Sequence, residues 1–138
     1  MNTLGGLFKT LADETRLRLI YLFLRSSDSL CVCELVDALG LPQYQVSRHL
    51  SALKAAGLVQ ATKQGTWAYH YLEEGSPLIQ ALWTFLREAP LSADSQEQIQ
   101  QDYQALTHRL ALRSNGCCVV GLNPNPLKDP TPKGDTFI

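Results

Sequence analysis

Apolar residues recur at helical spacing through the first forty positions of the chain. This spacing predicts a short helix over residues 4–11 and, after Asp13 as N-cap, a strongly apolar second helix that ends at the polar residues 26–29. A third helix is predicted from about residue 31 to residue 39. Gly40 follows it, and glycine commonly ends helices because it adopts a left-handed backbone without strain.

The pattern continues into a fourth helix and then changes period. Leu41-Pro42 makes a tight connection to this helix, which is expected to end at Gly57. One face of the helix is apolar: Val46, Leu50, Leu53 and Ala56. Residues 58–63 and 66–72 instead alternate in the manner of β-strands. Gln64-Gly65 lies between them, so the strands are expected to form a hairpin.

Two further helices are predicted after the hairpin. Ser76-Pro77 supplies the N-cap and the first residue of a helix that ends before Ala89-Pro90. Asp94, with Glu97 three residues later, resembles a capping box and opens an amphipathic helix to about Arg113. The remaining residues are rich in proline and glycine, which predicts an extended, mobile tail.

The order of these elements predicts a mainly α-helical fold with a small β-hairpin. Four helices, a hairpin and a helix, with a tight turn before the fourth helix, are typical of a winged helix-turn-helix, whose recognition helix enters the DNA major groove. The chain then divides into a DNA-binding domain over residues 1–90, a C-terminal helix over 91–113 expected at a dimer interface, and a tail over 114–138 that carries Cys117-Cys118.

The distribution of charge agrees with a DNA-binding segment in the middle of the chain. The 138 residues carry a formal net charge of −1, with 45% hydrophobic and 18% charged residues, as in ordinary globular proteins. Residues 38–72 contain Arg48, Lys54 and Lys63 but neither Asp nor Glu. A locally basic segment on an acidic body can approach phosphate groups, although a charge-poor solvated surface would show the same pattern.

The sequence does not have the pattern of a membrane protein. No apolar stretch approaches the length that spans a bilayer. The first residues also lack the charged region and apolar run of a secretory signal. We therefore expect a cytoplasmic protein with no membrane partner.

The outer face of the fourth helix and the hairpin tip carry side chains suited to DNA. Gln and Arg make bidentate contacts with base edges, whereas Ser, Lys and His mostly bind phosphates. The expected DNA-binding residues are Gln43, Gln45, Ser47, Arg48, His49, Lys54, Lys63 and Gln64. An ordinary amphipathic helix with a polar surface would show a similar pattern.

Three segments resemble, in the same order, parts of the ArsR/SmtB family of repressors. Residues 39–50, LGLPQYQVSRHL, resemble its helix-turn-helix. Residues 65–72, GTWAYHYL, resemble its wing, and residues 11–18, LADETRLR, resemble the opening of its second helix. The likeness covers roughly residues 4–90. Pro42 replaces the serine usual before the recognition helix, and Gln64 stands where the wing often has arginine.

This resemblance implies how the protein acts. Members of the family are homodimers that sit on an inverted-repeat operator in double-stranded DNA and repress transcription until an inducer binds. Their first and last helices form the dimer interface. We expect the same partners for this chain, which are operator DNA and a second copy.

Two cysteines lie at the predicted start of the third helix. Thiolate is a soft ligand for trivalent arsenic and antimony and for cadmium, lead and zinc, and a helix N-terminus stabilises a thiolate. Residues two apart in a helix point to different sides, so Cys31 and Cys33 can share one ion only if the first turn is non-helical or unwinds. As an alternative, buried cysteines serve as small hydrophobic residues. Residues 30–35, LCVCEL, resemble the arsenic- and cadmium-sensing members and favour metal binding.

The resemblance is incomplete at the remaining ligands. Arsenic-responsive members often have a third cysteine where this chain has Val36, and cadmium-responsive members often add N-terminal cysteines, which are absent before Cys31. Cys117 and Cys118 could supply the missing thiolates, from the same subunit or its partner. A reduced pair of adjacent cysteines chelates trivalent arsenic well, whereas a disulfide between them would be strained. An incidental or redox-active pair is the alternative.

Together these observations predict a metalloid-responsive repressor and not an enzyme. The expected inducer is trivalent arsenic or antimony, bound by Cys31, Cys33, Cys117 and Cys118, with no organic cofactor. The alternatives are a cadmium, lead or zinc sensor with four thiolate ligands, and a thiol-redox switch. No nucleophile with a neighbouring base and no Cys-x-x-Cys motif suggests a thiol enzyme.

Overall fold

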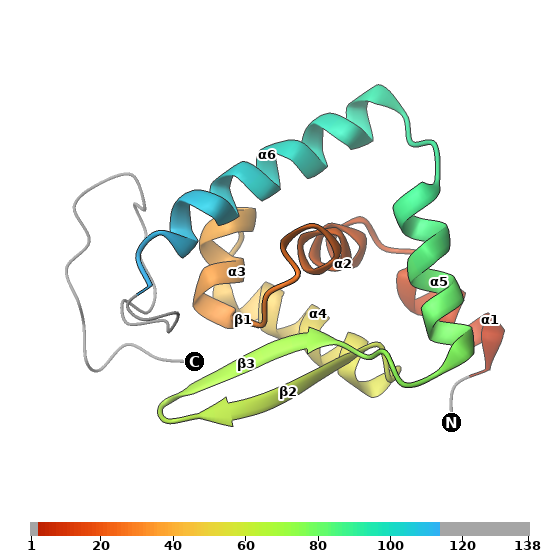
Figure 1. The fold of residues 1–138 in the computed structure, drawn as a ribbon, viewed down its shortest axis with the longest axis horizontal. Coiled ribbons are helices and arrows are strands. Elements are labelled where there is room, and N and C mark those ends of the chain that lie inside the picture. Colours follow the sequence, from red (N-terminus) through yellow and green to blue (C-terminus); the bar gives the residue numbers. More distant parts are fainter. Residues whose placement is uncertain (1–2, 114–138) are drawn as a thin grey trace.

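The computed structural model describes residues 3–113, which form the mainly helical fold with a small β-hairpin that the sequence predicts (Figure 1). The helices are α1 (Leu4–Leu11), α2 (Glu14–Ser26), α3 (Val32–Leu39), α4 (Gln43–Ala55), α5 (Pro77–Glu88) and α6 (Ala93–Leu110). The strands are β1 (Leu30–Cys31), β2 (Val59–Gln64) and β3 (Trp67–Leu72). The order and type of these elements confirm the predicted winged helix-turn-helix. Within residues 3–113, no helix has both the length and the apolar character needed to cross a bilayer.

The hairpin belongs to a three-stranded antiparallel sheet in the order β1-β3-β2. β2 pairs with β3 along its whole length. β1 adds two residues at the other edge of β3, with Leu30 opposite His70 and Cys31 opposite Tyr69. The sequence analysis missed β1, because two residues are too few to show an alternating pattern.

Capping interactions set the ends of the helices. Asp13 accepts a hydrogen bond from a first-turn backbone N–H at 3.0 Å and caps α2 as predicted. Gly40 ends α3 with φ of 68°, the left-handed conformation expected of a glycine there. The start of α6 differs from the prediction, since Ser92 rather than Asp94 is the N-cap and accepts from the N–H of Ser95. Ser and Asp cap helices about equally well, so residue type did not decide between them.

The hydrophobic core surrounds α2. In Figure 1, α6 crosses above α2 and α3, while α1 and α5 lie at the opposite end from α3. Leu19 and Ile20 of α2 are completely buried, and Ile99 and Leu106 of α6 pack into the same core. The apolar stripe predicted for the last helix therefore faces the protein's own interior.

An apolar surface remains exposed on α1 and α5, and we call it the α1–α5 surface. Its exposed side chains are Leu4 (54%), Phe8 (53%), Leu78 (48%) and Phe85 (60%). Together with neighbouring alanine and leucine side chains they line a shallow groove. Contiguous apolar surface of this kind usually marks an interaction site.

We expect the fold to lose stability in mild acid because of His70. Burial lowers the pKa of this side chain below its ordinary value of 6.5, and the charge of Lys54 lowers it further. Below a pH of about 6.5, His70 takes up a proton in the unfolded chain but stays neutral in the folded protein. The free energy of unfolding should therefore decrease as the pH falls. Urea unfolding at pH values of about 7.5 and 5.5 measures this decrease.

A single variant shows whether His70 is responsible. His70→Gln should make the free energy of unfolding less dependent on pH than it is in the wild type. Equal pH dependence in His70→Gln and the wild type would contradict this explanation.

Candidate thiol site and nucleic-acid interface

Cys31 and Cys33 lie together at the start of α3. Cys31 is the N-cap, with an extended backbone (φ −87°, ψ 162°), and the helix begins at Val32. The two Sγ atoms are 2.8 Å apart, and the residues are 1% and 0% exposed. The sequence analysis required a non-helical or unwound first turn for one ion to meet both sulfurs. The extended backbone of Cys31 meets this requirement without unwinding the helix.

The sheet explains why Cys31 is extended. Its backbone pairs with Tyr69 in the short ladder between β1 and β3, and a residue in such a ladder cannot also be helical. The side chains of Trp67 and Tyr69 pack with the two cysteines. The first half of β3 is therefore one wall of the thiol site.

A buried carboxylate closes the first turn of α3. Glu34 is 0% exposed, and its Oε1 accepts from the backbone N–H of Cys31 at 3.1 Å. Arg113, just after α6, donates from Nε to Oε2 at 2.6 Å and from Nη2 to Oε1 at 2.7 Å. These bonds to Glu34 raise the pKa of Arg113 above its ordinary value. Because both carboxylate oxygens accept hydrogen bonds, Glu34 is poorly placed to serve as a metal ligand.

An arginine within α6 reaches the thiol pair itself. Arg109 is 0% exposed, and its Nε donates to Oδ2 of Asp37 at 2.6 Å. Its Nη2 donates to Sγ of Cys33 at 3.5 Å. A guanidinium at this distance favours negative charge on sulfur, and the thiolate is the form that binds soft ions.

Within residues 3–113, no group of three or more His, Cys, Asp or Glu side chains is placed to hold a metal ion. Val36, at the position where a third cysteine would stand, packs against the hydrophobic core. Cys117 and Cys118 lie outside the described residues. Among the described residues, two thiols therefore come together without a third candidate ligand beside them.

Most of the predicted DNA-binding side chains face outward. The exposed or partly exposed ones are Gln43, Gln45, Ser47, Arg48 and Lys54 on α4, and Lys63 and Gln64 at the hairpin tip. Arg48 and Lys54 are exposed, as are both residues of the hairpin tip. This surface can therefore meet a nucleic acid without rearrangement.

The expectation that His49 is available to solvent or DNA is wrong. This side chain is 7% exposed, and its Nδ1 accepts a hydrogen bond from Nε of Arg16 at 3.1 Å. Position 49 lies three residues after Val46 and four before Leu53, so it shares their buried face. His49 attaches the recognition helix to the start of α2.

Tyr44 is a candidate that the sequence analysis missed. It is 71% exposed, more than any other exposed large hydrophobic side chain in residues 3–113. Tyr44 lies one helical turn before Arg48 and two turns before Ser51, so the three side chains share one outward face of α4. Its spacing of four residues from Arg48 could have identified it, but the sequence analysis considered only polar and charged side chains as DNA contacts.

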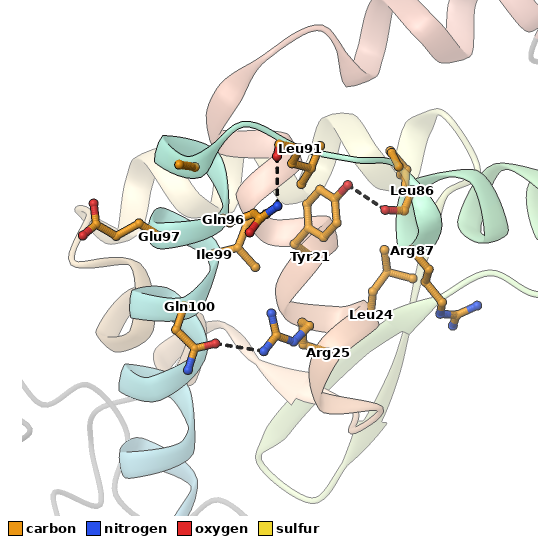
Figure 2. A pocket seen from close by; sticks show the side chains of 12 residues that line it. Tyr21, Leu24, Arg25, Leu86, Arg87, Leu91, Gln96, Glu97, Ile99 and Gln100 are labelled. Carbon is orange, nitrogen blue, oxygen red and sulfur yellow. Dashed lines mark hydrogen bonds between the residues drawn. The ribbon is translucent and has the colours of Figure 1, made fainter.

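A cleft of about 800 Å³ opens between α2, the α5–α6 connection and the first half of α6 (Figure 2). The hydroxyl of Tyr21 donates to the carbonyl of Leu86 at 2.8 Å, and Arg25 donates to Oε1 of Gln100 at 3.0 Å. The lining contains neither cysteine nor histidine. The cleft is thus separate from the thiol site, and its contacts show how the first half of α6 is attached to α2.

Comparison with known families and proteins points to transcription regulators. Residues 13–61 match the family described as bacterial regulatory protein, arsR family. The matched segment begins at the N-cap of α2, includes the thiol pair and the whole of α4, and ends within β2.

Three relatives illustrate the similarity. An uncharacterized HTH-type transcriptional regulator of Methanocaldococcus jannaschii is 46% identical over 66 residues, which cover 48% of this chain and 73% of the relative. The arsenical resistance operon repressor of Escherichia coli is 46% identical over 71 residues, covering 51% of this chain and 60% of the repressor. A cadmium resistance transcriptional regulatory protein of Listeria innocua is 32% identical over 71 residues, which cover 51% of this chain and 59% of the relative. The chain thus spans about three-fifths of the two metal-resistance regulators.

Removal of the buried carboxylate should destabilise the protein strongly. Glu34→Ala takes away the acceptor of two bonds from Arg113 and one from the N–H of Cys31, so we expect the free energy of unfolding to fall by about 3–5 kcal/mol. Glu88→Ala, at an exposed position on α5, should change it by less than about 0.5 kcal/mol. Urea unfolding of both variants measures the difference, and a small effect of Glu34→Ala would argue against this arrangement of charges.

Proposed function

Because the chain belongs to the arsR family of bacterial regulatory proteins, we propose that it is a metalloid-responsive transcriptional repressor. As a member of this family it is a DNA-binding regulator and not an enzyme. In the proposal, a homodimer binds operator DNA in the cytoplasm and releases it when cysteine thiolates bind trivalent arsenic or antimony. The observation that carries this assignment is the separation of 2.8 Å between Sγ of Cys31 and Sγ of Cys33, at the start of the helix before the recognition helix.

Cys31 and Cys33 would bind arsenic by ligand exchange. Each thiol that reacts with arsenous acid, As(OH)₃, forms one As–S bond while one As–O bond breaks. The thiol proton leaves with the hydroxide as water, and arsenic remains trivalent. The step therefore needs no oxidant or reductant. Arg109 assists because its guanidinium favours the thiolate form of Cys33.

We assign the remaining thiolate ligands to Cys117 and Cys118. Arg113 is the last described residue, and its guanidinium contacts Glu34 and the carbonyl of Ser29 beside the thiol pair. Cys117 follows four positions later, and four residues of chain reach at most about 14 Å. The same subunit can therefore supply the missing ligands.

A cadmium, lead or zinc sensor is the second candidate. Four cysteines match the four thiolates that zinc-like ions accept in tetrahedral sites. The similarity to a cadmium resistance regulator, at 32% identity, favours this candidate as well. The arsenical resistance repressor, at 46% identity, favours arsenic.

The DNA-binding part of the proposal places α4 in the major groove and the hairpin tip beside the phosphate backbone. Gln43, Gln45 and Arg48 have the side chains that read base edges. Tyr44 and Ser47 lie on the same half of the helix, while Lys54, Lys63 and Gln64 are suited to phosphates. His49 acts indirectly, because it holds α4 on α2. Phosphate contacts should make operator affinity fall steeply with salt.

The α1–α5 surface fits the interface of the proposed homodimer. Its four large side chains are about half exposed or more and would leave water when a second copy covers them. The apolar residues of α6, expected at this interface from the sequence, pack into the protomer's own core. We therefore assign the interface to α1 and α5.

Titration of an operator complex with arsenite tests the sensor assignment. Wild-type protein should release the operator, whereas Cys31→Ser should bind it with unchanged affinity and resist release. Replacement of Cys117 and Cys118 together by serine should weaken the response. Arg48→Ala should behave in the opposite way, losing operator affinity while its thiols still bind arsenite. Fluorescence anisotropy of labelled operator measures affinity and release, and titration of free thiols measures arsenite binding by Arg48→Ala.

Two outcomes would contradict these assignments. Release that persists in Cys31→Ser would place the sensor elsewhere, and an unchanged response in the Cys117/Cys118 variant would remove the tail pair from the site. Parallel titrations with cadmium and zinc decide between the two candidate functions.

A charge placed in the α1–α5 surface should separate the dimer. We expect Phe85→Glu to be monomeric by sedimentation equilibrium, because burial of an isolated carboxylate is strongly unfavourable. Its operator affinity should fall at least about tenfold, since one half-site is then bound alone. Thr84→Glu, on the same helix but outside this surface, should remain dimeric. A dimeric Phe85→Glu protein would rule out this interface.

A further inference from the structure

Buried charge in this protein is concentrated where α6 meets α2 and α3. Among residues 3–113, five polar or charged residues are buried, and Glu34, Asp102 and Arg109 lie at this contact. Taking charges out of water is costly unless they are paired, and such pairs specify geometry more than they add stability. The position of α6 against its neighbours is therefore closely specified.

One group of ion pairs holds the C-terminal end of α6 to α3, and we call it the sensor clamp. It joins Arg109 to Asp37 and Arg113 to Glu34. Glu34 and Asp37 are three residues apart on α3, a spacing that places both side chains on one helix face, while Arg109 lies in the last turn of α6 and Arg113 just after that helix. Arg109 also donates to Sγ of Cys33. The sensor clamp therefore holds the same turn that carries the thiols.

A second group holds α6 to the end of α3, and we call it the distal clamp. Arg18 of α2 donates from Nε and Nη2 to the two carboxylate oxygens of Asp102 on α6, both at 2.8 Å. Its Nη2 also donates to the carbonyl of Leu39 at 3.1 Å. The bond to Asp102 raises the pKa of Arg18, so this guanidinium stays charged. Leu39 is the last residue of α3, just before the turn into α4.

We propose that α6 links inducer capture to operator release, with Arg18, Arg109 and Arg113 as positioning residues. The inference rests on the proposed function. When the sulfur of Cys33 shares its electrons with a soft ion, it becomes a weaker acceptor for Arg109, and the sensor clamp shifts. The distal clamp ties the same helix to Leu39, so the shift reaches the turn before α4. The regulated element is the whole of α3, held at both ends.

The test removes the distal clamp without touching either proposed binding surface. Arg18→Met with Asp102→Leu deletes both charges together, which avoids leaving one of them buried alone. The measured quantity is the ratio of operator dissociation constants with and without arsenite. Couplings between two sites are typically about 5- to 150-fold, and we expect this ratio to fall from the wild-type value to below about twofold. Arsenite stoichiometry should stay at the wild-type value.

Arg25→Gln is the matched control. Arg25 also joins α2 to α6, through Gln100 and by lying 4.9 Å from the ring centroid of Tyr103, but it is exposed and lies on the cleft side of α2 (Figure 2). This variant should keep the wild-type ratio. Hydrogen exchange of the inducer-free proteins provides a second measurement, and residues 39–43 should exchange faster in the distal-clamp variant only.

The outcomes separate this inference from the proposed function. If arsenite, cadmium and zinc all fail to release the operator from wild-type protein, the proposed function fails and the inference falls with it. If wild-type protein responds and the distal-clamp variant keeps the full ratio, or if Arg25→Gln loses it equally, the inference alone is wrong. Should the double variant fail to fold, Arg18→Lys keeps the charge but loses the two-oxygen contact, and it should lower the ratio in the same direction.

Discussion

The extended backbone of Cys31 is the constraint on which the thiol site depends. Two residues of β1 pair with β3, so α3 cannot begin before Val32 and Cys31 becomes its cap. In a regular first turn the side chains of Cys31 and Cys33 would point to different sides of the helix. The sheet edge instead brings their sulfurs to 2.8 Å before any ion arrives. Strand β3 of the hairpin thus also shapes the surroundings of the two thiols.

Burial of charge connects this site to the rest of the protein. Glu34 closes the first turn of α3 from inside and binds Arg113, which lies just after α6. Arg109 of α6 reaches Asp37 and Cys33. Apolar side chains of similar volume would often stabilise such a contact as well or better. The charged pairs instead specify one register of α6 on α3. A change in charge at Sγ of Cys33 would therefore act first on Arg109 and, through it, on Asp37.

Three surfaces with different physical properties carry the three proposed roles of the molecule. The thiol site is buried and charged around its margin, the outward face of α4 is polar and exposed, and the α1–α5 surface is apolar and exposed. The helix-turn-helix lies between the first two, because α3 carries the thiols at one end and leads into α4 at the other. His49 shows that even the recognition helix is partly a packing element, since its imidazole accepts from Arg16.

The sequence by itself determined the helices, the hairpin, the family resemblance and the thiol chemistry, because these follow from residue type and from spacings of a few positions. It placed Asp13, Gly40 and the hairpin correctly, and it located two cysteines at the start of α3. Only the tertiary structure decided that their sulfurs converge, that His49 is buried, and that Arg109 and Arg113 lie at the site. Arg113 and Glu34 are 79 positions apart in the chain. No local pattern reports which distant side chains meet, since that depends on how completed helices pack and on which charges their packing removes from water.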